Sequence, residues 1–138
     1  MGEVSVKVEL RNVADMMTSG AGKAGQRIRH HEMTAVVDTG AVMLALPQDV
    51  VEKLGLQFVR NAVVSYADER REELKVMGAV NITIGDRQMM TECLMLPPTA
   101  EALIGQVVLE TLDLLVDCQR QTLVPRPESP ILASSKLK

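Results

Sequence analysis

A single aspartate between two apolar runs is the feature that most constrains how this chain can fold. The stretch at residues 35–46 reads AVVDTGAVMLAL, and apolar runs of this length around a glycine corner are typical of buried strands. We therefore expect strands at residues 33–38 and 42–46, joined at Thr39-Gly40. A carboxylate in such a place is costly unless it is paired, hydrogen-bonded or used in chemistry. Gly40 permits a close approach of the backbone to the carboxylate, and its N–H can stabilise the charge of Asp38.

Strand patterns dominate the rest of the chain. Valines and leucines alternate with polar residues at 4–10, and long antiparallel strands are expected over 57–96, with a charged tip at 67–71 and a turn at Gly85-Asp86. A last hairpin is expected over 114–124, short helices at 47–54 and 106–113, and a mobile loop at 11–32. The fold class is therefore all-β with one or two short helices. We expect one domain over residues 1–125 and a weakly ordered tail over 126–138.

Composition excludes several classes of function. The net charge is −3 with both signs interspersed, and the chain has no Trp, one Tyr and one Phe, so we expect no nucleic-acid partner. No apolar run approaches the ~18 residues of a membrane span, and the N-terminus lacks a signal peptide. We expect a cytoplasmic protein with no membrane partner. Cys93 and Cys118 fit neither a disulfide framework nor a zinc site, so reduced thiols are expected.

No cofactor or metal is predicted. His30-His31-Glu32 are adjacent in sequence and cannot easily share one tetrahedral site, so the polar start of a strand is the better interpretation. The glycine-containing segment at 20–24 lacks the first Gly and the final Ser/Thr of a phosphate-binding loop.

A second motif, Leu103-Ile104-Gly105, lies about 65 residues beyond Asp38 and precedes an expected helix. With the Asp-Thr-Gly-Ala corner, the short helix and the long hairpin, it completes an order of elements that resembles the retropepsin-like aspartic proteases, the retroviral-type family. The resemblance is closest to small bacterial single-domain members, which carry VDTGA followed by LP..VV..LGL; here the second segment reads LPQDVVEKLGL at 46–56. It implies a closed barrel, the double-psi-type half of an acid protease.

What the resemblance implies for the site is specific. Asp38 is the catalytic aspartate, and Thr39, Gly40 and Ala41 form its supporting loop. The Leu103-Ile104-Gly105 motif packs against that loop. A flap over about 62–76 closes on the substrate, and its tip is formed by Tyr66, Ala67, Asp68 and Glu69. Glu69 takes the place where bacterial relatives often carry glycine, and Gln106 the place where retroviral enzymes usually carry arginine.

This chemistry needs two carboxylates. One deprotonates water and the other protonates the scissile carbonyl, because like charges about 3 Å apart cannot both ionise. The chain has one Asp-Thr-Gly, so the second aspartate has to come from another copy across a two-fold axis. The resulting hypothesis is a homodimeric aspartic endopeptidase acting on peptides or proteins. Its substrate pockets are expected to be apolar and lined by residues such as Val36, Met43, Ile82 and Leu103. Two alternatives stay open: a non-catalytic peptide-binding module on the same fold, and an unrelated barrel in which Asp38 only caps a turn.

Overall fold

The structure is a computed structural model that describes residues 3–19, 27–66 and 68–126. The expected tail from residue 127 onward, the segment 20–24 and the tip residue Ala67 lie outside the described residues. The elements in chain order are β1 (Ser5–Asn12), α1 (Val13–Ser19), β2 (His30–Val37), β3 (Leu44–Pro47), α2 (Gln48–Leu54), β4 (Gln57–Ser65), β5 (Arg71–Ile84), β6 (Arg87–Leu96), β7 (Ala102–Ile104), α3 (Gln106–Leu112), β8 (Leu114–Asp117) and β9 (Thr122–Pro125).

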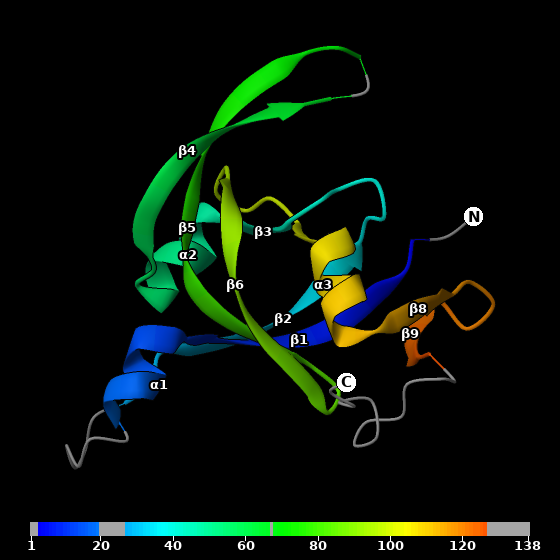
Figure 1. The fold of residues 1–138 in the computed structure, drawn as a ribbon, viewed down its shortest axis with the longest axis horizontal. Coiled ribbons are helices and arrows are strands. Elements are labelled where there is room, and N and C mark those ends of the chain that lie inside the picture. Colours follow the sequence, from blue (N-terminus) through cyan, green and yellow to red (C-terminus); the bar gives the residue numbers. More distant parts are fainter. Residues whose placement is uncertain (1–2, 20–26, 67, 127–138) are drawn as a thin grey trace, which may run out of the picture.

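Six strands form a closed barrel. They follow the order β1-β2-β7-β3-β6-β5, and pairing of β1 with β5 closes the ring (Figure 1). Most neighbours are antiparallel, but β2 with β7 and β3 with β6 are parallel. β4 pairs only with β5 among the described strands and carries that hairpin beyond the barrel wall. The all-β prediction is therefore confirmed.

The core follows from the alternation seen in the sequence. In β1, Val6, Val8 and Leu10 are buried while Ser5 and Lys7 are exposed, because successive side chains of a strand point to opposite faces. The two expected helices, α2 and α3, close the ends of this core with side chains spaced at helical intervals. These are Val50, Val51 and Leu54 in α2, and Val108, Leu109 and Leu112 in α3.

Local signals place the helices and turns well. α2 starts after Pro47 and ends at Gly55, which adopts the left-handed conformation (φ 66°) that glycine tolerates. The β5–β6 turn likewise has Gly85 at φ 63°. α1, α2 and α3 have seven residues each, and the described part of the chain contains no helix long and apolar enough to cross a membrane.

The segment 11–32 is not one loop as expected. β1 runs to Asn12, α1 follows immediately, and β2 starts at His30. Asn12 caps α1 by accepting the Asp15 backbone N–H (2.9 Å), and its amide donates to the Leu54 carbonyl at the end of α2 (2.8 Å). Asp15 in turn accepts two side-chain bonds from Arg29 (2.8 and 3.0 Å). These tertiary bonds hold a third helix that the sequence analysis missed.

Candidate active site

Asp38 stands at the end of β2, where two parallel strands finish side by side. Val36 and Val37 of β2 pair with Leu103 and Ile104 of β7. The ladder then ends with a hydrogen bond from the Asp38 N–H to the Ile104 carbonyl (3.0 Å). The apolar residues on both sides of the aspartate therefore serve to fix its backbone in the barrel wall.

The Asp38 carboxylate is held by its own loop. The Gly40 N–H donates to Asp38 Oδ1 (3.0 Å), and the Ala41 N–H donates to the Asp38 carbonyl (3.1 Å). Asp38 is half-buried, and within the described ranges no cation forms an ion pair with it and no protein group bonds its second carboxylate oxygen. One oxygen is thus fixed and the other is left for water, substrate or a second carboxylate.

Gly105 allows the start of α3 to pack closely against the Asp38 loop. The Gln106 N–H donates to the Ala41 carbonyl and the Val107 N–H to the Val42 carbonyl, both at 2.9 Å. A Cβ on Gly105 would lie 2.6 Å from the Met43 carbonyl oxygen and 2.7 Å from the Val42 carbonyl carbon, which are backbone atoms. Glycine is required here by close approach of two backbones rather than by its dihedral angles, since φ is −95°.

Close packing does not require a glycine at position 40 within this chain. A Cβ there would meet only Asp38 Oδ1, at 3.4 Å, which is ordinary contact. The expected approach of the Gly40 backbone to the carboxylate is observed as the 3.0 Å N–H bond to this oxygen, whereas the close contact between two backbones occurs at Gly105. The role that remains for Gly40 is donation of its N–H to the carboxylate and an open space in front of it.

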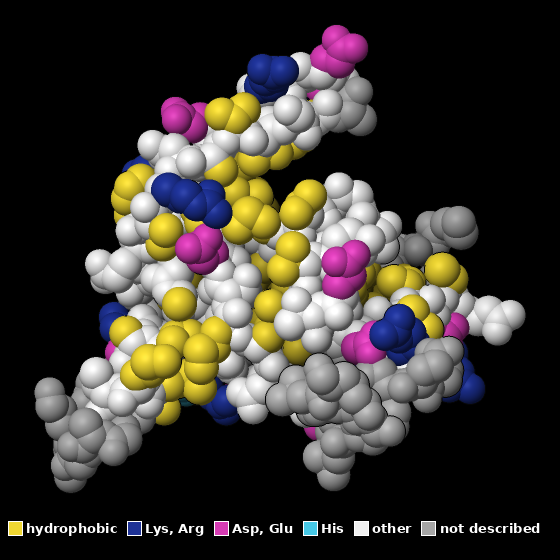
Figure 2. Space-filling model, viewed as in Figure 1, with side chains coloured by type: hydrophobic (Ala, Val, Ile, Leu, Met, Phe, Trp, Pro, Cys, Tyr) yellow, Lys and Arg dark blue, Asp and Glu magenta, His cyan; other side chains and the backbone are white. Residues whose placement is uncertain are grey.

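Apolar side chains surround this loop. Val42 is 67% exposed and Val107 38% exposed, and their backbones are hydrogen-bonded to each other. Figure 2 shows a hollow beneath the projecting β4–β5 hairpin with hydrophobic side chains along its walls. Ile82, expected to line a substrate pocket, is instead fully buried, because its strand faces Leu10 of β1 where the barrel closes.

The tip of the β4–β5 hairpin is a compact polar cluster. The Tyr66 hydroxyl donates to the Glu72 carboxylate (2.7 Å), and the Arg70 guanidinium lies over the Tyr66 ring, 4.4 Å from its centroid. The bond to Glu72 raises the pKa of the Tyr66 hydroxyl. Asp68 accepts the Arg70 backbone N–H, and Glu69 has a φ of 67°. Sequence reasoning found the tip but missed the Tyr66–Glu72 pairing, which crosses the turn.

The predicted site residues fall into two groups in space. Asp38, Thr39, Gly40 and Ala41 lie against Leu103, Ile104 and Gly105, through the backbone bonds given above. Tyr66, Asp68 and Glu69 lie at the far end of the β4–β5 hairpin, and in the part of the chain that the structure describes they make no hydrogen bond or ion pair with the Asp38 loop. Among the same residues no cluster of His, Cys, Asp or Glu could hold a metal ion.

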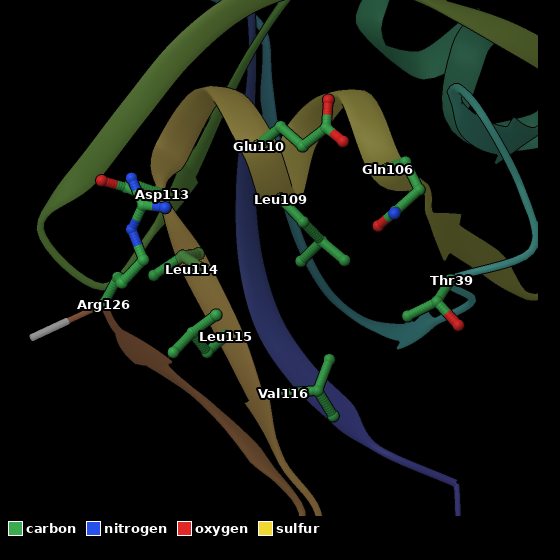
Figure 3. Close-up of a pocket in the computed structure, with 9 residues that line it drawn as sticks. All are labelled: Thr39, Gln106, Leu109, Glu110, Asp113, Leu114, Leu115, Val116 and Arg126. Atoms are coloured by element: carbon green, nitrogen blue, oxygen red, sulfur yellow. The ribbon is translucent and has the colours of Figure 1, made fainter.

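A groove beside the loop was not anticipated. It has a volume of about 460 Å³, and Figure 3 shows it between α3 and β8, with Thr39 on the far side. Its lining consists of Thr39, Gln106, Leu109, Glu110, Asp113, Leu114, Leu115, Val116 and Arg126. The available signal was the adjacent Leu114 and Leu115 soon after the helix, because a two-stranded ribbon cannot bury two neighbouring leucines alone.

Comparison with known proteins agrees with this geometry. A family model described as gag-polyprotein putative aspartyl protease matches residues 24–111, which include the Asp38 loop, the β4–β5 hairpin and the Leu103-Ile104-Gly105 motif. No curated protein matches the sequence. The match covers more than half of the chain and contains both motifs that build the site, so the chain belongs to the family of gag-polyprotein putative aspartyl proteases.

Proposed function

We propose that the protein is a homodimeric aspartic endopeptidase in which Asp38 and the partner's Asp38 activate a water molecule. The observation that carries this proposal is the Asp38 carboxylate itself. One of its oxygens is fixed by the Gly40 N–H, the other has no protein partner among the described residues, and the loop is locked by Gly105. Family membership supplies the chemical context.

The division of labour follows from repulsion between the two carboxylates. Brought within about 3 Å, the pair shares one proton because two adjacent negative charges are unfavourable. The ionised Asp38 takes a proton from water as the water attacks the scissile carbonyl carbon. The protonated Asp38 donates its proton to the carbonyl oxygen. The aspartate that took the proton from water then gives it to the leaving nitrogen. The other aspartate takes a proton back from one hydroxyl of the tetrahedral intermediate, and the C–N bond breaks.

The dimer has to form through the face that carries Thr39. β8 and β9 make a separate two-stranded sheet with no further strand partner among the described strands, and unpaired edges favour association. Leu115 on this hairpin is 44% exposed although it lies beside the apolar groove. A second copy docked here would place the two Asp38 loops next to each other.

The β4–β5 hairpin is proposed to act as the flap. It projects beyond the barrel over a hollow with apolar walls (Figures 1 and 2), so an extended peptide could lie between the hairpin and the Asp38 loop. Such a peptide would be bound through its main chain, with alternate side chains directed to apolar surfaces such as Val42 and Val107. We therefore expect cleavage between hydrophobic residues.

The deciding experiment compares Asp38→Asn with Asp86→Asn. Both changes remove one carboxylate, but Asp86 is exposed in the turn between β5 and β6. A diverse peptide library is incubated with each protein and read by mass spectrometry, with and without a pepstatin-type inhibitor. Cleavage is expected for wild type and Asp86→Asn and absent for Asp38→Asn. Cleavage by Asp38→Asn would show that the mechanism is wrong.

A peptide-binding module without catalysis is the second candidate. The polar cluster at the hairpin tip favours it, because Tyr66, Glu72 and Arg70 hold each other in place and no glycine lies in this segment to ease opening. In that case wild type and Asp38→Asn would bind extended peptides alike, by fluorescence anisotropy, and neither would cleave them.

A further inference from the structure

The groove between α3 and β8 is apolar inside and charged at its rim. Leu109 of α3 is 4% exposed and forms its base, whereas Leu115 of β8 is 44% exposed. Glu110 and Asp113 stand on the rim together with Arg126 (Figure 3). A groove with this lining suits a short apolar segment with cations close to it in sequence.

The chain itself leaves the described structure at this groove. The Arg126 N–H donates to the Asp113 carbonyl (3.1 Å), and its guanidinium pairs with the Asp113 carboxylate (2.8 Å). Both bonds hold the residue after β9 against the C-cap residue of α3. The described chain therefore ends at the rim, where Glu110 lies one helical turn before Asp113.

The sequence that follows has the matching chemistry. Residues 127–138 read PESPILASSKLK: Glu128, then an apolar Pro130-Ile131-Leu132-Ala133 segment, then Lys136 and Lys138 on its C-terminal side. Ile131 is five residues beyond Arg126, a distance of up to roughly 16 Å when the chain is extended. The groove side of β8, from Leu114 to Val116, is only about 7 Å long. The apolar segment can therefore reach any point of the groove.

We propose that residues 130–133 of the chain's own C-terminal segment occupy this groove in the monomer and compete there with a second copy of the chain. This inference rests on the proposed function, because the groove has Thr39 of the Asp38 loop on its rim. A tethered segment acts at an effective concentration of about millimolar, so it wins over a dilute second protomer. Dimerisation would then be held back at low concentration.

Occupancy is tested directly by disulfide trapping in the full-length chain. Leu115→Cys and Ile131→Cys are combined in a Cys118→Ala background, and Val63→Cys with Ile131→Cys is the control, since Val63 is exposed on β4. Oxidation is done below the concentration of dimer formation and mapped by mass spectrometry. The first pair is expected to cross-link within one chain, faster than the control. Equal rates, or a cross-link between chains, would overturn the inference.

The regulatory consequence is tested by sedimentation velocity over a range of concentrations. Ile131→Asp/Leu132→Asp is expected to lower the dimer dissociation constant by about tenfold, because the tethered competitor is removed. Ser134→Asp/Ser135→Asp adds the same charge to the same segment and should leave the constant unchanged. An unchanged or weaker dimer in the first variant refutes the competition. If no variant dimerises, the proposed function fails. The trapping result still decides whether the C-terminal segment occupies the groove.

Discussion

Gly105→Ala is the sharpest test of how the Asp38 loop is held. The new methyl would lie 2.6 Å from the Met43 carbonyl oxygen, 2.7 Å from the Val42 carbonyl carbon and 2.8 Å from the Val42 oxygen. All three are backbone atoms, so a rotamer change cannot relieve the contact. To reach ordinary contact at 3.4 Å, the loop has to retreat by about 0.8 Å from α3.

The cost can be worked out from the bonds that this retreat breaks. The Gln106 and Val107 N–H bonds to the loop, each 2.9 Å, would be stretched beyond useful length, at about 1 kcal/mol each. Overpacking adds about 1–3 kcal/mol. Alanine has less conformational freedom than glycine in the unfolded chain and can adopt φ −95°. This difference stabilises the folded variant by about 0.4–1 kcal/mol and offsets part of the loss. We expect a net loss of about 2–5 kcal/mol in the free energy of unfolding, and a melting temperature lower by roughly 10 °C.

Gly40→Ala is the matched control, because its methyl meets only Asp38 Oδ1 at 3.4 Å. Urea denaturation followed by circular dichroism gives the free energy of unfolding of both variants, and hydrogen exchange reports on the Gln106 and Val107 amides. Gly105→Ala should be destabilised with faster exchange at these amides, and Gly40→Ala should be close to wild type. A Gly105→Ala protein within about 0.5 kcal/mol of wild type would refute the close-packing argument.

Three further predictions concern stability, the hairpin tip and the thiols. Hydrogen bonds from Arg29 lower the pKa of Asp15 from 3.8 to about 2. The pair therefore stabilises the fold above pH 4, and this stabilisation is lost as the pH falls toward 2. Asp15→Asn should be less stable than wild type at pH 7, and the difference between their urea midpoints should disappear over that pH range. Glu69→Gly should be more stable than Glu69→Ala by about 1 kcal/mol in thermal denaturation, because Glu69 has a φ of 67°; equal stability would contradict this. Burial raises the pKa of the Cys93 thiol to about 12 while Cys118 is exposed, so the native protein should titrate one thiol with Ellman's reagent and the denatured protein two.

Much of the fold could be predicted from local sequence patterns. The alternation in β1, the Pro47 and Gly55 boundaries of α2 and the Gly85 turn each depend on neighbours in sequence, and the structure has all of them. α1 was missed although Asn12 and Asp15 have the spacing of a capping pair. A seven-residue helix is too short to be stable alone. Its support, the Asn12 bond to Leu54, spans 42 residues of sequence and cannot be read locally.

The candidate site was predictable in its residues and less so in its packing. Asp38 and the Leu103-Ile104-Gly105 motif could be named because each lies at a recognisable strand end. That their backbones touch, with glycine forced at 105 rather than at 40, depends on the parallel pairing of β2 with β7 and on the start of α3. Ile82 was placed in a substrate pocket because alternation alone does not tell which strand face a barrel closes over.

The Asp38 loop is complete in one protomer, and this shapes what dimerisation has to achieve. The bonds that hold the loop come from Ile104 of β7, from the first residues of α3, and from the loop itself. In the proposed dimer, a second copy therefore would not need to order the site. It would only have to bring its own preformed carboxylate, which keeps the entropic cost of assembly to that of docking two rigid bodies. Dimer strength and loop geometry should then vary independently. Leu115→Asp should shift the protein concentration at which cleavage appears while leaving hydrogen exchange in the Asp38 loop unchanged, and a coupled change in both would mean that the partner helps to shape the loop.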